Sequence, residues 1–304
     1  MSETGLNYLL AALNAGSMRA AADKLNVAAS SISRQIAQLE QVYGMPLIEK
    51  ARRGVQLTEA GRIVIDHYRD ELANREALSA RLEELRSVRS GRVVIAAGEG
   101  FLGDSFMELI QRFNDGNPDI RVEIQIGSSV DVTHMIVDDE AHLGLVFNTA
   151  PDPKVRVRAS IAQPLMAIMR PDHPLASLSS VSIAELAQHQ LCLAPRNFRL
   201  AQILAAAEQQ AGHFLEPSIM TNSIYVMREA VRSGTAISIL PRVTVWSELQ
   251  RGEFISIPVA NSAMETTTLS LILRAGRQLE GAPVRMLTQL EAQMRQWGKT
   301  ATQG

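Results

Sequence analysis

The sequence predicts an all-α head at the N-terminus, then a long connecting helix, then a C-terminal α/β domain of two lobes. Three observations support this prediction. Residues 1–60 carry short apolar stripes at helical spacing. Residues 58–90 continue with one long stripe that no proline interrupts. From residue 91 onward, apolar runs of strand length alternate with amphipathic segments, which is the pattern of an α/β fold.

The composition excludes several classes of protein. A length of 304 residues suits two or three domains, and a hydrophobic content of 46% is ordinary for a chain that buries its cores. The single cysteine, Cys192, excludes a disulfide framework and is typical of a core residue in a reducing compartment. No stretch has the length of a membrane span, and no secretion signal is visible. We therefore expect a cytoplasmic protein without metal or organic cofactor.

The head reads as a helix-turn-helix. Leucines recur at helical spacing up to Gly16, and Ser17 is a plausible N-cap for a second helix over residues 18–25. A third helix follows over residues 28–40, and its outer face is small and polar, which suits a DNA major groove. The residues expected to face DNA in this region are Ser17, Ala29, Ser30, Ser31, Ser33, Arg34 and Gln35. The alternative is a plain three-helix bundle with a solvated face.

Residues 47–57 read as a hairpin with a basic tip. Two short apolar pieces flank a turn that contains Lys50, Arg52, Arg53 and Gly54. The net charge of the chain is −2, so a positive tip of this kind matters more for nucleic-acid binding than the total charge does. We expect Arg52 and Arg53 to enter a minor groove, the alternative being a solvated turn.

The connecting helix is expected to begin after Thr58 as its N-cap. One apolar stripe runs along it: Ile65, Tyr68, Leu72, Leu78, Leu82 and Leu85. A long helix with one apolar stripe requires a partner helix, and a second copy of the same helix is the simplest partner. The alternative is packing against its own C-terminal domain.

The C-terminal region, residues 91–300, divides into two α/β units. Strands over residues 92–97, 120–126 and 143–147 alternate with helices, which predicts a parallel layout with right-handed crossovers. We assign residues 91–162 and 269–300 to lobe I and residues 163–268 to lobe II. Two lobes joined by two crossing strands form a hinged clamp, as in periplasmic binding proteins.

The first strand-to-helix turn contains a misleading motif. Residues 98–103 read G-x-G-x-x-G, the dinucleotide-binding fingerprint. The fingerprint also requires an acidic residue at the end of the second strand, but that strand ends in Gly127, Ser128 and Ser129. An NAD(P)-binding oxidoreductase or a redox sensor using this turn is therefore the alternative function, and no catalytic constellation supports an enzyme.

Together these residues resemble the LysR-type transcriptional regulators. The resemblance is carried by the following residues: Gly16, Ser17, Ala21, Ala22, Leu25, Val27, residues 32–36, Leu39, Glu40, Gly44, Leu47 and residues 57–61. Two departures stand out. Ala29-Ser30 replaces the Gln-Pro that often starts the recognition helix, so the base-reading amide is lost, and Leu47-Ile48-Glu49-Lys50 replaces Leu-Phe-x-Arg at the start of the wing.

The resemblance implies a winged helix-turn-helix followed by a periplasmic-binding-protein-like effector domain. It implies a sequence-specific DNA-binding regulator, not an enzyme, that is controlled by a small metabolite bound between the lobes. Double-stranded DNA, a homodimer or homotetramer and RNA polymerase are the corresponding partners. In that family, the turn at residues 98–103 forms one wall of the effector site.

The effector site is expected at the carboxyl ends of the strands, where ligands bind in open α/β sheets. Its candidate residues are Gly98, Glu99, Gly100, Phe101, Ser128, Ser129, Phe147, Asn148, Pro195, Arg196, Asn222 and Ser223. Arg196 is suited to hold a carboxylate, which makes a carboxylate the expected effector. Glu99 has two expected orientations: facing the site, where it favours an amine or hydroxyl, or facing solvent, where it caps the next helix. The second is favoured.

Overall fold

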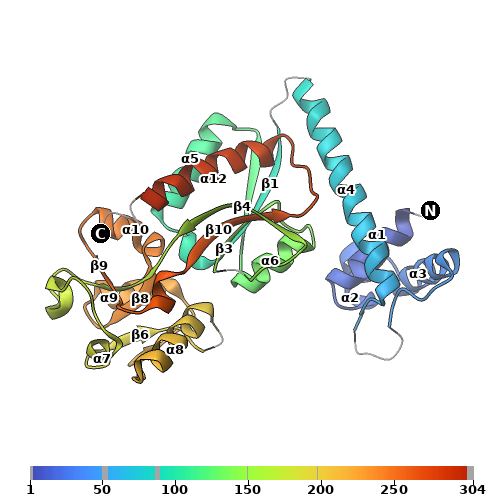
Figure 1. Cartoon of the computed structure of the whole chain (residues 1–304). Coiled ribbons are helices and arrows are strands. Elements are labelled where there is room, and N and C mark those ends of the chain that lie inside the picture. The colour runs from blue at the N-terminus through green and yellow to red at the C-terminus, as the bar shows by residue number, and fades with distance from the viewer. Residues whose placement is uncertain (1–2, 50–53, 86–89, 149, 197, 300–304) are drawn as a thin grey trace. The chain divides into compact units, whose positions relative to one another are not determined.

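The computed structural model describes residues 3–49, 54–85, 90–148, 150–196 and 198–299. The chain divides into two compact units, Met1–Glu76 and Ala77–Gly304. In Figure 1 the first unit is blue, and the second runs from cyan to red. None of the helices described here is both long and apolar enough to cross a bilayer.

The first unit is helical. Its helices are α1 (Glu3–Asn14), α2 (Met18–Leu25), α3 (Ala29–Tyr43) and the beginning of α4 (Glu59–Leu85). Leu9, Ile32 and Ile65 come from α1, α3 and α4, and each side chain is fully buried. The predicted bounds of the second helix agree with α2, and the third helix extends three residues beyond its predicted end.

Gly61 in the first turn of α4 allows the helix to lie against the chain that precedes it. A Cβ at this position would lie 2.1 Å from the backbone oxygen of Leu47, far inside van der Waals contact. Thr58 secures the same junction: its Oγ1 donates to Pro46 O at 2.7 Å and accepts from Gly61 N at 3.0 Å. The start of α4 and the base of the predicted hairpin are therefore one packed element.

The second unit contains two five-stranded sheets. Lobe I has the strand order β2-β1-β3-β10-β4, and lobe II has the order β7-β6-β8-β5-β9. The strands of lobe I are β1 (Gly91–Ala97), β2 (Ile120–Ile126), β3 (Leu143–Phe147), β4 (Val155–Ala162) and β10 (Thr268–Arg274). The strands of lobe II are β5 (Leu165–Met169), β6 (Leu191–Leu193), β7 (Ile219–Met220), β8 (Ile237–Pro241) and β9 (Ile255–Pro258).

Helices cover both faces of each sheet, as Figure 1 shows. In lobe I, α5 (Asp104–Gly116) and α12 (Ala282–Lys299) lie on one face and α6 (Ser129–Val137) on the other. In lobe II, the longer helices are α8 (Arg199–Ala211) and α9 (Ile224–Arg232). The shorter ones are α7 (Ile183–Leu186), α10 (Trp246–Gln250) and α11 (Ser262–Glu265), and short 3-10 turns occupy Glu99–Phe101, Pro174–Ser177 and Arg242–Val245.

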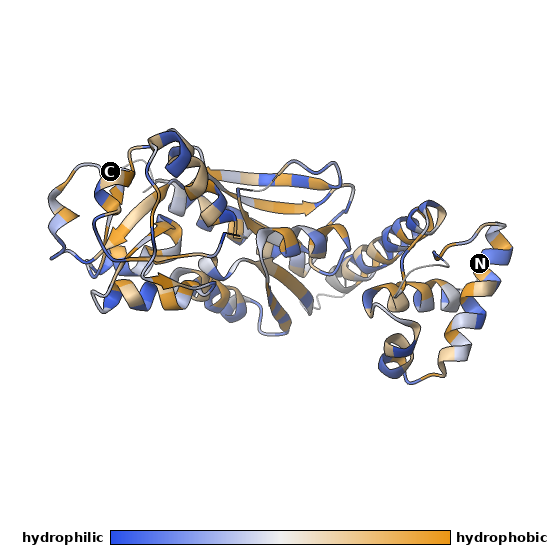
Figure 2. Cartoon of the chain, turned by 90° about the horizontal axis from the view of Figure 1, so that it is seen from below, coloured by the Kyte–Doolittle hydropathy of each residue, from blue (hydrophilic) through white to orange (hydrophobic). Residues whose placement is uncertain are grey.

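The strands are largely hydrophobic, whereas the helices alternate between hydrophobic and hydrophilic residues (Figure 2). Strands that are covered on both faces read as near-continuous apolar runs. β5 and β8 follow this rule, because every residue in each of them is buried. One apolar cluster continues from the sheet of lobe I into that of lobe II.

The parallel layout predicted for the sheets is correct except for one strand in each. β10 runs antiparallel to β3 and β4, and β5 runs antiparallel to β8 and β9. Both reversed strands directly follow a crossing between the lobes.

The two crossing segments are bonded to each other at Gln163 and Thr267, both of which are 1% exposed. Gln163 N donates to Thr267 O at 2.9 Å, and Thr267 Oγ1 donates to Gln163 O at 2.6 Å. The Gln163 side chain then contacts both lobes: Nε2 donates to Trp297 O at 3.3 Å, and Oε1 accepts from Val243 N at 3.1 Å. This buried amide ties the lobes together where the chain passes between them.

Candidate nucleic-acid interface and effector site

The turn between α2 and α3 is held by local caps. Ser17 Oγ accepts a hydrogen bond from Ala20 N at 3.1 Å and begins α2, as predicted. Asn26 ends α2 in the left-handed conformation (φ 59°), which asparagine tolerates better than most residues, and its N–H bonds to Ala22 O. The chain therefore reverses sharply before α3.

The outer face of α3 is small, polar and uncovered. Burial of Ile32 and Ile36 against the head turns the residues between them outward. Four of the residues predicted to face DNA are exposed: Ala29, Ser30, Ser33 and Arg34. Ser31 and Gln35 are half-buried at the edges of the same face. One helix thus presents this part of the predicted set, whereas Ser17 serves as the cap of α2.

The hairpin predicted after α3 is present at its base. Ile48 and Leu57 form an antiparallel bridge, and Glu49 N donates to Gln56 O at 2.9 Å. The tip, with Arg52 and Arg53, lies outside the described residues.

At the end of β1, the G-x-G-x-x-G turn lies against lobe II. A Cβ on Gly100 would lie 3.2 Å from Thr244 Oγ1 and 3.8 Å from Ile224 Cγ1, both residues of lobe II. Phe101 is buried, and its ring lies 3.4 Å from the position of a Cβ on Gly98. Gly100 therefore allows a close approach between the lobes, whereas Gly98 makes room for Phe101 within the turn.

Glu99 reaches from this turn to the N-terminus of α9. Its carboxylate accepts hydrogen bonds from Ser223 Oγ at 3.1 Å, from Ile224 N at 3.1 Å and from Tyr225 N at 3.3 Å. Ser223 is the N-cap of the helix, and its Oγ also accepts from Val226 N at 3.4 Å. Glu99 was expected to face solvent and to cap the helix that follows it in sequence. The structure contradicts this expectation, because the side chain faces the other lobe and caps α9 there.

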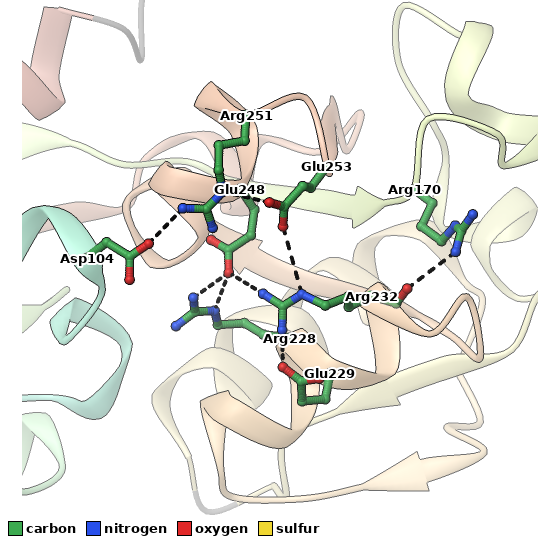
Figure 3. A network of polar contacts seen from close by, with 8 residues as sticks. All are labelled: Asp104, Arg170, Arg228, Glu229, Arg232, Glu248, Arg251 and Glu253. Atoms are coloured by element: carbon green, nitrogen blue, oxygen red, sulfur yellow. Dashed lines mark hydrogen bonds and ion pairs between the residues drawn. The ribbon is translucent and has the colours of Figure 1, made fainter.

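A second polar contact joins the lobes nearby. Asp104, in the first turn of α5, bonds to Arg251 at 2.8 Å, and Arg251 also bonds to Glu253 at 2.6 Å. The bond with Arg251 lowers the pKa of the Asp104 carboxyl below its ordinary value, and the positive charge of Arg228 adds to this effect. Figure 3 shows this contact beside a larger arginine–glutamate network in lobe II.

The centre of that network is Glu248, whose side chain is 1% exposed. It accepts from Arg228 Nε at 2.9 Å and from Arg232 Nη2 at 2.9 Å, and both arginines lie on α9. Arg232 also pairs with Glu229 and lies 5.7 Å from the centre of the Phe254 ring. A buried carboxylate bonded to two guanidinium groups fixes α9 to α10.

The predicted serines at the end of β2 have structural partners. Ser128 forms a capping box with Asp131 at the start of α6, and this bonding lowers the pKa of the Asp131 carboxyl. Ser129 Oγ bridges the backbone of Phe147, with Phe147 O at 3.1 Å and Phe147 N at 3.2 Å. Asn148 adopts a positive φ of 49°, and its N–H donates to Thr268 O.

On lobe II, two predicted side chains remain open to a ligand. Arg196 follows β6 and Asn222 follows β7, and these strands are parallel neighbours. Both side chains are exposed, and within the described part of the chain neither makes a hydrogen bond. Pro195 beside them is half-buried.

Comparison with known proteins places both the head and the C-terminal domain in one family. Residues 4–62 match the bacterial regulatory helix-turn-helix protein family of lysR type, and residues 86–295 match the LysR substrate binding domain. The chain belongs to the LysR family of transcriptional regulators. It is therefore a DNA-binding regulator with an effector-binding domain, as its sequence predicts, and not an enzyme.

Named relatives agree with this assignment. The chain is 25% identical over 264 residues to the RuBisCO operon transcriptional regulator of Allochromatium vinosum, covering 86% of each chain. It is 26% identical over 286 residues to the SDS degradation transcriptional activation protein of a Pseudomonas species, covering 91% of each.

Solved structures show the same fold. A full-length OxyR variant from Pseudomonas aeruginosa has a TM-score of 0.67 at 18% identity, with 97% of this chain and 95% of that chain covered. Full-length CbnR complexed with its target DNA has a TM-score of 0.56 at 19% identity, with 98% and 100% covered.

The alternative function, a dinucleotide enzyme or a redox sensor, finds no support in this LysR-family chain. Glu123, the acidic residue nearest the end of the second strand, pairs with Arg92 and Arg121. Cys192 is fully buried, and burial raises the pKa of its thiol, whereas reactive cysteines are accessible with lowered pKa values. Among the residues described, no group of three or more His, Cys, Asp and Glu side chains is arranged to hold a metal.

The contacts between the lobes that sequence reasoning missed join segments that are far apart in the chain. Arg251 meets the start of α5, Thr244 meets the turn after β1, and Gln163 meets Trp297, although each pair is far apart in sequence. Gln163 offers no local signal beyond being a polar residue between apolar runs. The partners of Glu99 and Asp104 follow only from the three-dimensional arrangement of the lobes.

The Asp104–Arg251 pair predicts a pH dependence. Because its folded pKa is lowered, Asp104 contributes stability above the ordinary carboxyl pKa of about 4, and loses it as the pH falls through the lowered value. Asp104→Asn is therefore expected to lower the melting temperature at pH 7, and its difference from the wild type is expected to shrink as the pH falls below about 4. Both side chains are about half exposed, so the cost at pH 7 is below about 1 kcal/mol.

Thermal unfolding of the full-length protein across this pH range measures the effect. Asp119→Asn is the control, because that carboxyl is exposed and makes no hydrogen bond within the described residues. A difference between wild type and Asp104→Asn that stays constant from pH 7 to pH 3 contradicts the prediction.

Proposed function

We propose that α3 of this LysR-family regulator lies in the major groove of a dyad-symmetric DNA site. Ser30, Ser33 and Arg34 contact the DNA, and Arg52 and Arg53 enter the adjacent minor groove. The observation that carries this proposal is the outward, uncovered position of Ser33 and Arg34. Short hydroxyl side chains allow a helix to lie deep in the groove, and a guanidinium reaches a phosphate or a guanine edge.

Arg34→Ala is expected to weaken DNA binding by roughly 10-fold or more, because one charge-assisted contact to DNA is worth about 1–3 kcal/mol. Fluorescence anisotropy with a labelled upstream fragment at fixed salt measures the change. Arg295→Ala removes the same charge from an exposed position on α12 and serves as the control. Equal affinities for Arg34→Ala and the control rule out this role for Arg34.

We further propose that the regulator assembles as a dimer or a dimer of dimers through α4. Ile65 and Tyr68 at the start of its stripe are buried in the head, but Leu72, Leu78 and Leu82 are 36%, 59% and 49% exposed. The end of α4 touches its own effector domain through other positions. Arg81 pairs with Glu280, and Ala80 Cβ lies 3.1 Å from the position of a Cβ on Gly281. The leucines therefore remain available to a second copy.

Leu78→Glu is expected to shift the protein toward monomer at micromolar concentration, since a charge in an apolar helix seam opposes pairing. Sedimentation velocity reports the assembly state. Met107→Glu, an equally drastic change at an exposed position of α5, is the matched control and keeps the assembly of the wild type. An unchanged sedimentation coefficient for Leu78→Glu overturns the proposed seam.

For the effector, we propose a small carboxylate held between the lobes near Arg196 and Asn222. The two exposed side chains lie past the ends of adjacent parallel strands, where ligands of α/β sheets bind. Arg196 supplies charge-assisted hydrogen bonds and Asn222 a neutral donor.

Arg196→Ala is expected to weaken a carboxylate effector about 10-fold or more, the worth of a charge-assisted hydrogen bond. Thermal-shift screening of the full-length protein with carboxylates and their amides identifies the ligand, and calorimetry then compares variants. Arg156→Ala, exposed on β4, is the control. An effector whose amide binds as well as its acid, or equal affinities in both variants, contradicts the proposal.

A cytoplasmic location and contact with RNA polymerase are expected of a promoter-bound regulator. Transcription reconstituted from purified polymerase, promoter DNA and this protein tests the second expectation.

A further inference from the structure

The contact between Glu99 and α9 joins the two lobes at a point away from the crossing segments. Glu99 belongs to lobe I, and its three donors belong to lobe II. Two of these donors are the free backbone N–H groups of the first helical turn, where the helix dipole favours a negative charge. A side chain of the protein itself therefore provides the anion that such a terminus favours.

Local sequence makes this contact close. Gly100 follows Glu99, and a Cβ there would come within 3.2 Å of Thr244 Oγ1, so a larger residue would crowd the Thr244 side chain of lobe II. Glycine at this position lets the carboxylate come within hydrogen-bonding distance of Ile224 N and Tyr225 N.

Asp104 provides a second attachment from the same β1–α5 segment. It bonds to Arg251, the residue that ends α10. The buried Glu248 of α10 is bonded to Arg228 and Arg232 of α9, so the two attachment points in lobe II belong to one braced pair of helices (Figure 3). Both contacts therefore act between the same two rigid bodies.

We propose that Glu99 and Asp104 form a two-point acidic latch that holds the lobes closed when no effector is bound. The lobes open about the crossing at Gln163 and Thr267 only when the latch releases. An effector that binds the open arrangement more tightly has to overcome the bonds of Glu99 and Asp104, which lowers its apparent affinity. An effector that binds the closed arrangement more tightly meets lobes that are already closed. This inference rests on the proposed function, because a latch regulates output only if lobe closure controls DNA binding or activation.

Distances between spin labels on the two lobes test the latch in the full-length protein. Labels at Asn114→Cys on α5 and Gln209→Cys on α8 occupy exposed positions, and the buried Cys192 stays unlabelled. Labelled chains are diluted with unlabelled ones so that only distances within one chain are measured. No DNA and no effector are present.

The wild type is expected to give one narrow distance distribution. Glu99→Ala is expected to broaden it and shift it to longer distances, Glu99→Gln to do so less, and the double change with Asp104→Asn to do so most. Glu108→Gln, which removes an exposed carboxylate of α5 without a hydrogen bond in the described part of the chain, keeps the wild-type distribution. If Glu99→Ala does not fold, Glu99→Gln with Asp104→Asn gives the same readout.

A wild-type distribution retained in Glu99→Ala, or in Glu99→Gln with Asp104→Asn, overturns the latch. Failure of the proposed function is seen separately. If the wild type does not bind DNA in the anisotropy experiment, the proposed function fails, but the distances between the labels are still those expected of the latch. If the latch variants change the distances while DNA affinity stays that of the wild type, the role of α3 is unaffected.

Discussion

The orientation of α3 depends on the burial of three side chains. Ile32, Ile36 and Leu39 recur at helical spacing and are all buried against the rest of the head. Because a helix has a fixed period, burying these residues leaves no choice about where Ser33 and Arg34 point. The apolar core of the head thus determines which side chains of α3 face outward toward DNA, although the core residues themselves are buried.

The effector domain uses polar groups where the head uses apolar ones. Its sheets are packed by aliphatic and aromatic side chains, and one apolar cluster continues between the lobes, but Gln163, Glu99 and Asp104 add directional polar bonds across the junction. Apolar packing is non-directional and tolerates few rearrangements, whereas a small number of hydrogen bonds gives a junction with a defined geometry that is open to competition. A division of this kind suits a domain in which two rigid lobes move relative to each other.

Most of the fold was predictable from the sequence because its signals are local. Ser17 begins α2 and Thr58 begins α4 as predicted, since N-caps act within a few residues. The reversed direction of β10 was not predictable, because strand direction depends on how the chain crosses between the lobes. The partner of Glu99 was not predictable either, because Ile224 and Tyr225 lie more than a hundred residues away. The outward face of the recognition helix followed from periodicity alone, whereas the serines at the end of β2 were assigned to a ligand when their hydroxyls serve the backbone.

The packing of Gly61 against Leu47 has a mechanical consequence. Since the backbone of the hairpin base lies in contact with the first turn of α4, and Thr58 bonds to both, the hairpin has no hinge of its own at this point. A rotation of the first turn of α4 is therefore transmitted directly to the base of the hairpin at Pro46 and Leu47.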